Sequence, residues 1–137
     1  MTRQFHLDVE TTGDNDIQNL SPLLTEQLKA DRGVGVVNVF VRGSTAGVTT
    51  LEFEPGLVKH DVAKLMQRLA PDDADYFHEA TWNDDNGHSH LRASLVGPSV
   101  TVPFKDGKLL CGEYQQVVLC EFDTRPRKRV LIVTVMS

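Results

Sequence analysis

The chain has 137 residues, a formal net charge of −5 at neutral pH, 40% hydrophobic residues and 24% charged residues. This length suits a single domain over residues 1–137 that folds without a disulfide, and the composition excludes a disordered chain. The negative charge disfavours nucleic acid as a partner, because that binding begins with a positive field over phosphates. The longest apolar runs, such as Val36–Val41 and Val130–Met136, are only as long as strands, so no membrane is predicted as a partner.

The N-terminus of the chain and its cysteines favour a cytoplasmic protein. The first residues contain no apolar stretch of the kind found in a secretory signal. Cys111 and Cys120 show no CxxC or zinc-ribbon spacing, so we expect them to be reduced and buried in strands. The one basic run, Arg125–Arg129, contains a proline and lies between apolar segments, which predicts a solvated hairpin turn.

The first half of the chain alternates between strand and helix patterns. Ser21-Pro22 is typical of a helix start, and the apolar stripe from Leu57 to Leu69 has helical spacing that only Asp61 interrupts. The patterns predict strands over residues 3–9, 16–20, 36–41 and 48–54, and helices over residues 21–31 and 57–69.

The second half begins with an irregular, polar stretch over residues 75–97 and then continues as strands. These strands are expected over residues 99–104, 108–111, 114–122 and 129–136, and Asp106-Gly107 is a strong hairpin signal. The order of elements predicts an α+β fold with β-sandwich-like mixed or antiparallel sheets and two main helices in the first half.

Three of the five histidines, His78, His88 and His90, fall within 13 residues of one another. Their number suits a zinc site with three histidine ligands and an open fourth position. His88 and His90 share a face only in an extended segment, and the turn-like Asn86-Gly87 pair places them ahead of a helix, where they would converge. The alternative is that all three are polar loop histidines without a common ligand.

Two further groups of residues are candidates for the same site. Glu52 lies on the polar face of its strand, where a carboxylate is either solvated or serves as a base or metal ligand. Asp61 interrupts an apolar stripe and therefore needs a polar partner. The Gly43–Gly47 loop offers hydroxyls and backbone amides to an anion, although it lacks the lysine of a phosphate-binding P-loop.

The run from Tyr76 through Gln116 resembles the YjbQ family, a largely uncharacterised group of small proteins. The matching segments are Ser89–Ser99, Thr101–Pro103, Asp106–Leu109 and Gly112–Gln116, and the first half adds Val39–Val41, Ala46, Thr49, Glu52, Pro55 and Asp61 in the expected order. Two departures stand out. Gly43-Ser44-Thr45-Ala46 replaces a motif that begins with histidine in many relatives, and His88 stands where aspartate is common. We expect His88 to compensate for the missing histidine.

The resemblance implies a β-sandwich α+β fold, a homotrimer with sites near the subunit boundaries, and a divalent metal held by histidines. It also implies an activity similar to thiamine-phosphate synthase, which joins a pyrimidine pyrophosphate to a thiazole phosphate. The expected metal is zinc, or magnesium with the pyrophosphate substrate. The expected roles are metal binding by His78, His88 and His90, catalysis by Glu52, Asp61 and His90, and binding of a small anionic, phosphorylated molecule by Ser44, Thr45, Arg92, Ser94 and Gln115.

Two other functions fit the same residues. A metal-dependent hydrolase would use the open metal position to activate water. A non-catalytic protein would bind a small molecule or assemble without turnover.

Overall fold

The computed structural model describes residues 1–137 and has two antiparallel sheets, which confirms the predicted α+β class. Sheet A has the strand order β1-β8-β3-β5-β6, and sheet B has the order β2-β7-β4. The strands are β1 (Thr2–Glu10), β2 (Asp16–Asn19), β3 (Val34–Arg42), β4 (Ala46–Glu52), β5 (Ser99–Lys105), β6 (Lys108–Leu109), β7 (Gln115–Glu121) and β8 (Lys128–Met136).

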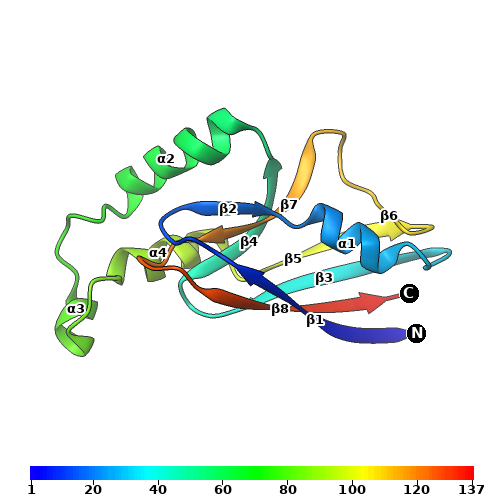
Figure 1. Cartoon of the computed structure of the whole chain (residues 1–137), viewed down its shortest axis with the longest axis horizontal. Helices are drawn as coiled ribbons and strands as arrows, with labels where there is room; N and C mark the ends of the chain where they lie inside the picture. Colours follow the sequence, from blue (N-terminus) through cyan, green and yellow to red (C-terminus); the bar gives the residue numbers. More distant parts are fainter.

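The helices after the first cover one edge and one end of these sheets, whereas the first helix lies within the curve of the strands (Figure 1). They are α1 (Ser21–Leu28), a π-helical turn η1 (Leu57–Asp61) that continues into α2 (Val62–Leu69), α3 (Phe77–Trp82) and α4 (Gly87–Val96). None of them is long and apolar enough to cross a membrane. The two chain ends lie side by side at the opposite end of the molecule, where the Met1 amino group donates to the Ser137 carbonyl at 2.9 Å.

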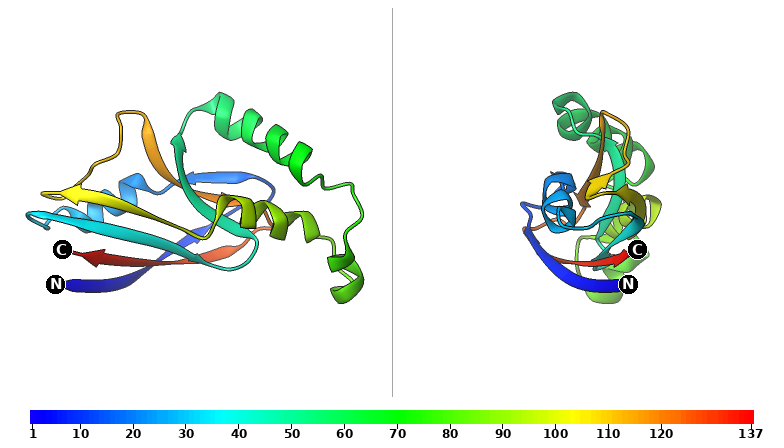
Figure 2. Two further views of the ribbon diagram at one scale, coloured as in Figure 1. Left: turned by 180° about the vertical axis from the view of Figure 1, so that it is seen from behind. Right: turned by 90° about the vertical axis from the view of Figure 1, so that its right-hand side faces the viewer.

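The main core fills the space between the two sheets and α1. Figure 2 shows the strands curling around α1, whose Leu24 and Leu28 are fully buried against the inward residues of β3, β7 and β8. Ser21 begins α1 as predicted but does not cap it, because its Oγ accepts the Val117 N–H at 2.9 Å. Asp106 and Gly107 both adopt positive φ in the predicted β5–β6 hairpin.

A second, smaller core lies on the outer face of sheet B, beneath α2 and α4. It includes Val118, Cys120 and Phe122 of the β7 segment with Met66 of α2 and Ala93 of α4. β7 is therefore buried on both faces, which explains its continuous apolar sequence.

Residues 75–97 are largely helical rather than irregular, so that prediction is wrong. α4 begins at Gly87, whose N–H donates to Glu79 Oε1 of α3 at 2.6 Å. A Cβ at Gly87 would lie 2.5 Å from that oxygen and 2.7 Å from Tyr76 Cβ, so glycine is what lets α3 approach α4. The sequence predicted a turn at Gly87, but in the structure this glycine allows two helices to pack closely.

Candidate functional site

Two hollows in the surface meet at His90, at the end of the molecule opposite the termini. The loop hollow, of about 250 Å³, lies between the β3–β4 loop and α4 and is lined by Gly43, Ser44, Ala46, His90, Ala93, Ser94 and Pro98. The aromatic hollow, of about 360 Å³, lies between α3 and α4 and is lined by Tyr76, Phe77, His78, Gly87, His90 and Leu91. His90 alone lines both, so a ligand that occupies either hollow lies next to this residue.

The His90 ring lies next to that of His78, with ring centroids 4.4 Å apart and planes inclined by 55°. His78 Nε2 is fixed by Asn86 Oδ1 at 3.0 Å and lies 3.3 Å from Asp84 Oδ2. No protein group hydrogen-bonds to the His90 ring, so both of its nitrogens are free for a ligand. The pair therefore consists of one imidazole held in place and one open to the hollows.

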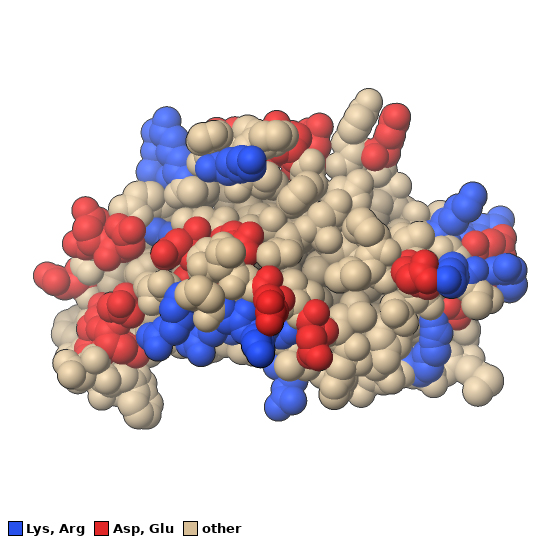
Figure 3. Space-filling model, viewed as in Figure 1, with Lys and Arg blue, Asp and Glu red and all other residues tan.

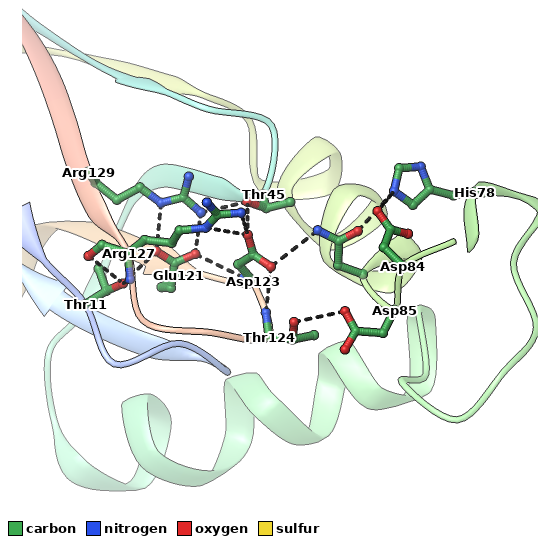
Figure 4. Close-up of polar contacts among 11 residues, drawn as sticks. Thr11, Thr45, His78, Asp84, Asp85, Glu121, Asp123, Thr124, Arg127 and Arg129 are labelled. Carbon is green, nitrogen blue, oxygen red and sulfur yellow. Dashed lines mark hydrogen bonds and ion pairs between the residues drawn. The ribbon is translucent and has the colours of Figure 1, made fainter. Parts of the chain in front are cut away.

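A chain of hydrogen bonds connects His78 with the protein interior (Figure 4). Asn86 Nδ2 donates to Asp123 Oδ1 at 3.3 Å, so Asn86 Oδ1 is left to accept the Nε2–H of His78. This arrangement places the free lone pair of a neutral His78 on Nδ1. Asn86 is itself buried, so the orientation of His78 is set from below the surface.

Asp123 belongs to a group of residues that we call the buried charge network, in which only Arg127 is exposed: Thr11, Thr45, Glu121, Asp123, Arg127 and Arg129. Glu121 accepts Arg129 Nε at 2.7 Å and Arg129 Nη2, and its Oε2 also accepts the Thr11 hydroxyl at 2.8 Å. Asp123 accepts Arg127 Nε at 2.8 Å and the Thr45 hydroxyl at 3.1 Å. Glu121 and Asp123 are completely buried, and each is paired with an arginine.

The hydrogen bonds to Asp123 decide its ionisation. Burial by itself would raise the pKa of this carboxyl, but donors from Arg127, the Thr124 N–H, Asn86 and Thr45 outweigh burial and lower the pKa to about 2. Asp123 is therefore ionised at neutral pH and acts as a fixed negative charge behind Asn86.

Comparisons with known proteins assign the chain to a family. The family model described as "UPF0047 protein YjbQ-like" matches residues 5–137. The chain belongs to the UPF0047 family. A UPF0047 protein of Methanothermobacter thermautotrophicus is 40% identical over 101 residues, which cover 74% of this chain and 68% of that protein.

Solved structures of the UPF0047 family have the same fold. A YbjQ-like protein of unknown function from Sulfolobus solfataricus superposes with a TM-score of 0.86 at 23% identity, covering 100% of this chain and 99% of that one. An uncharacterised YjbQ/UPF0047 protein from Clostridium acetobutylicum gives a TM-score of 0.79 at 28% identity, covering 95% of this chain and 99% of that one. These relatives are described without an activity, a substrate or a cofactor.

The structure brings some of the predicted site residues together and separates others. Ser44, His90 and Ser94 line the loop hollow, and Thr45 is a buried residue of the same β3–β4 loop. The His78 ring lies next to that of His90. Arg92 is buried on the other side of α4, where it donates to the Ala70 carbonyl, Gln67 and Asn15.

Three further predicted site residues line neither hollow. Gln115 hydrogen-bonds to Thr50 at 2.9 Å and lines a separate hollow near α1. Glu52 is its cross-strand neighbour and is exposed, as is Asp61 at the end of η1. These residues do not lie near His90, and their predicted roles remain predictions.

The predicted metal site of His78, His88 and His90 is wrong. His88 and His90 lie within α4, where a separation of two residues turns side chains by roughly 200°. His88 therefore points inward, with 4% of its surface exposed and its ring 6.4 Å from that of Tyr76. Burial, and then the charge of Arg92, lower the pKa of His88. No three His, Cys, Asp or Glu side chains converge so as to hold a metal ion.

The predicted function falls with this site. A thiamine-phosphate synthase or a metal-dependent hydrolase was expected around the three histidines, and the residues present do not form the ligand set. The comparisons add only a family of unknown function and no synthase. The prediction of either metal-dependent activity is therefore corrected.

Sequence patterns missed the buried charge network. Residues 125–128 are exposed, as a solvated turn requires, but Arg129 is 6% exposed and Arg127 pairs with Asp123. One signal was available: Arg129 shares the inward phase of β8 with Leu131, Val133 and Val135, and Glu121 continues the apolar run of β7. An arginine and a glutamate at inward positions of neighbouring segments indicate a buried pair.

Proposed function

We propose that this UPF0047 protein binds a small anionic molecule in the loop hollow and transfers a proton to or from it through His90. The observation that carries the proposal is the position of His90, which faces both hollows with free nitrogens beside an imidazole that is held in place. Histidine is the side chain best suited to exchange a proton near neutral pH. No metal takes part in the proposed step.

His78 supports His90 as a positioning residue. Its Nε2–H is held by Asn86 Oδ1, and Asp84 lies close enough to stabilise a positive charge on the ring. A ring fixed in this way restricts the orientation of the adjoining His90 ring at 4.4 Å. The Ser44 and Ser94 side chains complete the polar lining, and the aromatic hollow accepts an apolar part of the same ligand.

The proposal is tested with phenyl phosphate, whose two halves suit the two hollows. We expect NMR shift changes at Ser44, His90 and Ser94. As the pH rises through the range in which histidines lose their proton, the affinity of the wild-type protein should fall about tenfold more than that of His90→Gln. The His90→Gln variant is the reference because titration of the ligand itself affects both proteins equally. Equal pH dependence in the two proteins, or shifts that map elsewhere, would refute the proposal.

We also propose a homotrimer that covers the helical end of the chain. Large apolar side chains are exposed on α2, α3 and α4, namely Leu65, Leu69, Phe77, Trp82, Leu91 and Leu95. Such a surface favours association with a second copy. Light scattering should give about three times the chain mass of 15.2 kDa, and a Leu91→Glu/Leu95→Glu variant should give the mass of one chain. A wild-type mass of one chain would exclude the trimer.

A cytoplasmic location is proposed from the cysteines. Cys111 and Cys120 are both free, and burial raises the pKa of the Cys120 thiol to about 12. Unpaired, unreactive thiols are common where the surroundings are reducing.

A further inference from the structure

The β3–β4 loop leaves three consecutive backbone donors without an acceptor. Gly43, Ser44 and Thr45 lie between β3 and β4, and none of their N–H groups hydrogen-bonds to a backbone or side-chain atom of the protein. Gly43 and Ser44 are exposed, and Thr45 is buried. Consecutive free N–H groups at a turn are a known means of binding anions.

The guanidinium of Arg129 lies directly behind this loop. Its Nε and Nη2 are used by Glu121 and by the Thr45 hydroxyl, which accepts Nη2 at 2.7 Å. Its Nη1 has no acceptor in the protein. Arg129 Nη1 is not among the buried side-chain nitrogen and oxygen atoms without a partner, which are Asp84 Oδ1 and Ser89 Oγ. Solvent therefore reaches Nη1, on a side chain that is only 7% exposed.

Gly43 leaves Nη1 accessible. A Cβ at position 43 would lie 2.6 Å from Arg129 Nη1, and the backbone there has a φ of +139°, which disfavours any other residue. The same glycine lines the loop hollow next to Ser44. The absence of a side chain at residue 43 therefore leaves an arginine nitrogen open beside the hollow that His90 faces.

We propose that Arg129 Nη1, the N–H groups of Gly43, Ser44 and Thr45, and the Ser44 hydroxyl bind the phosphate group of a phosphate monoester. Together they offer about six hydrogens, which matches the three terminal oxygens of a phosphate better than the two of a carboxylate. The free Nη1 of the Arg129 guanidinium adds a charge-assisted contact. The inference rests on the proposed function for the location of the ligand, and it adds the chemical class of that ligand.

Charge balance explains why Arg129 is free to bind. Thr11, the Asp123 N–H and Arg129 itself donate to the Glu121 carboxylate, so this negative charge is satisfied on the side of the guanidinium away from Gly43. The network of two arginines and two carboxylates is formally neutral. Because the whole chain carries a net charge of −5, close hydrogen bonds rather than a long-range field must hold the phosphate.

The test is a titration of the full chain with inorganic phosphate, with acetate as the competing arm, followed by amide NMR. We expect phosphate to shift the amides of Gly43, Ser44 and Thr45 and to bind at least about tenfold more tightly than acetate. Gly43→Ala, which covers Nη1, should weaken phosphate binding about tenfold. Gly33→Ala is the control, because it also places a side chain at a positive φ, of +80°, but its Cβ meets nothing within 4 Å.

A second variant removes the donor without removing the charge. Arg129→Lys retains a cation for Glu121 but lacks the Nη1 donor, so phosphate binding should fall as in Gly43→Ala. Unchanged phosphate affinity in a folded Gly43→Ala or Arg129→Lys protein would overturn the inference, as would a wild-type titration that leaves residues 43–45 unshifted.

The His90→Gln variant separates this inference from the proposed function. Phosphate should still shift the amides of residues 43–45 in that variant, because none of the proposed phosphate donors belongs to His90. If phosphate shifts residues 43–45 but His90→Gln does not change the pH dependence of phenyl phosphate affinity, the phosphate site is supported and the proton-transfer proposal is refuted. An effect of His90 on phenyl phosphate without shifts at residues 43–45 would do the reverse.

Discussion

The two ends of β8 show opposite ways of filling an interior. Towards the C-terminus, Val135 packs in the same core as Leu28 and Phe104 around α1, and no charged group is buried there. Towards the helical end, Arg129 occupies the same inward face, and its neighbours are Glu121 and Thr45. One strand thus runs from an apolar core into the buried charge network.

This difference separates stability from function. The apolar end stabilises the fold by removing hydrocarbon surface from water. A buried ion pair costs desolvation that its attraction only partly offsets, so apolar residues of similar size would serve stability equally well. The charges occur where the loop hollow and His78 lie, which agrees with a role in holding the Gly43–Thr45 loop and Asn86 in place. Figure 3 shows acidic and basic side chains mixed at this end, with no continuous basic face in that view.

The largest effect is expected from Glu121→Gln. This change leaves the Arg129 charge buried without its counterion, and it should lower the free energy of unfolding by about 3–5 kcal/mol in urea denaturation. A Glu121→Leu/Arg129→Met protein should recover part of that loss, because neither charge remains. A double variant less stable than the single one would contradict the view that the pair is costly to bury.

At the apolar end, Leu28→Ala should cost about 3 kcal/mol through the lost contacts and the cavity that remains. Phosphate binding at residues 43–45 should not change, since α1 lies at the other end of the core. Urea denaturation and the phosphate titration together check this. If phosphate affinity fell in parallel with stability, the two ends would be coupled and the comparison would fail.

Acid should destabilise the charged end specifically. The folded-state pKa of Asp123 is about 2, below its ordinary value of 3.8, so its contribution is complete above pH 3.8 and is lost as the pH falls towards 2. The shift corresponds to about 2 kcal/mol. Asp123→Asn should be less stable than wild type at neutral pH and should show a flatter pH dependence over this window. An identical acid dependence in both proteins would show that other carboxylates determine it.

A smaller pH effect is expected from His88 beneath α4. Burial and Arg92 lower its pKa from 6.5, so the unfolded chain takes up a proton that the folded protein does not. Stability due to this group is complete above pH 6.5 and declines as the pH falls below it. His88→Gln should flatten the pH dependence of thermal stability below pH 6.5, whereas His90→Gln, at a partly exposed residue, serves as the control. A flat wild-type curve would contradict the assignment.

Local patterns in the sequence specified most of the strands and the α+β class. Strand-like sequence patterns located β1, β3, β5 and β8 to within a few residues, and the Asp106-Gly107 hairpin forms where it was predicted. These features depend on neighbouring residues, whose side-chain period and turn chemistry are visible in one dimension. The UPF0047 resemblance was also available from the segments between Tyr76 and Gln116.

Tertiary structure alone decided the site. The α4 helix begins at Gly87, whose N–H donates to Glu79 of α3. Within this helix His88 points inward, whereas the His90 ring lies next to His78, so only two of the three histidines lie together. The joining of Asn86, Asp123 and Arg129 depends on contacts between segments far apart in the chain. The periodicity of a sequence indicates which side chains share one face of a helix or strand. Which residues contact that face depends on how the whole chain packs.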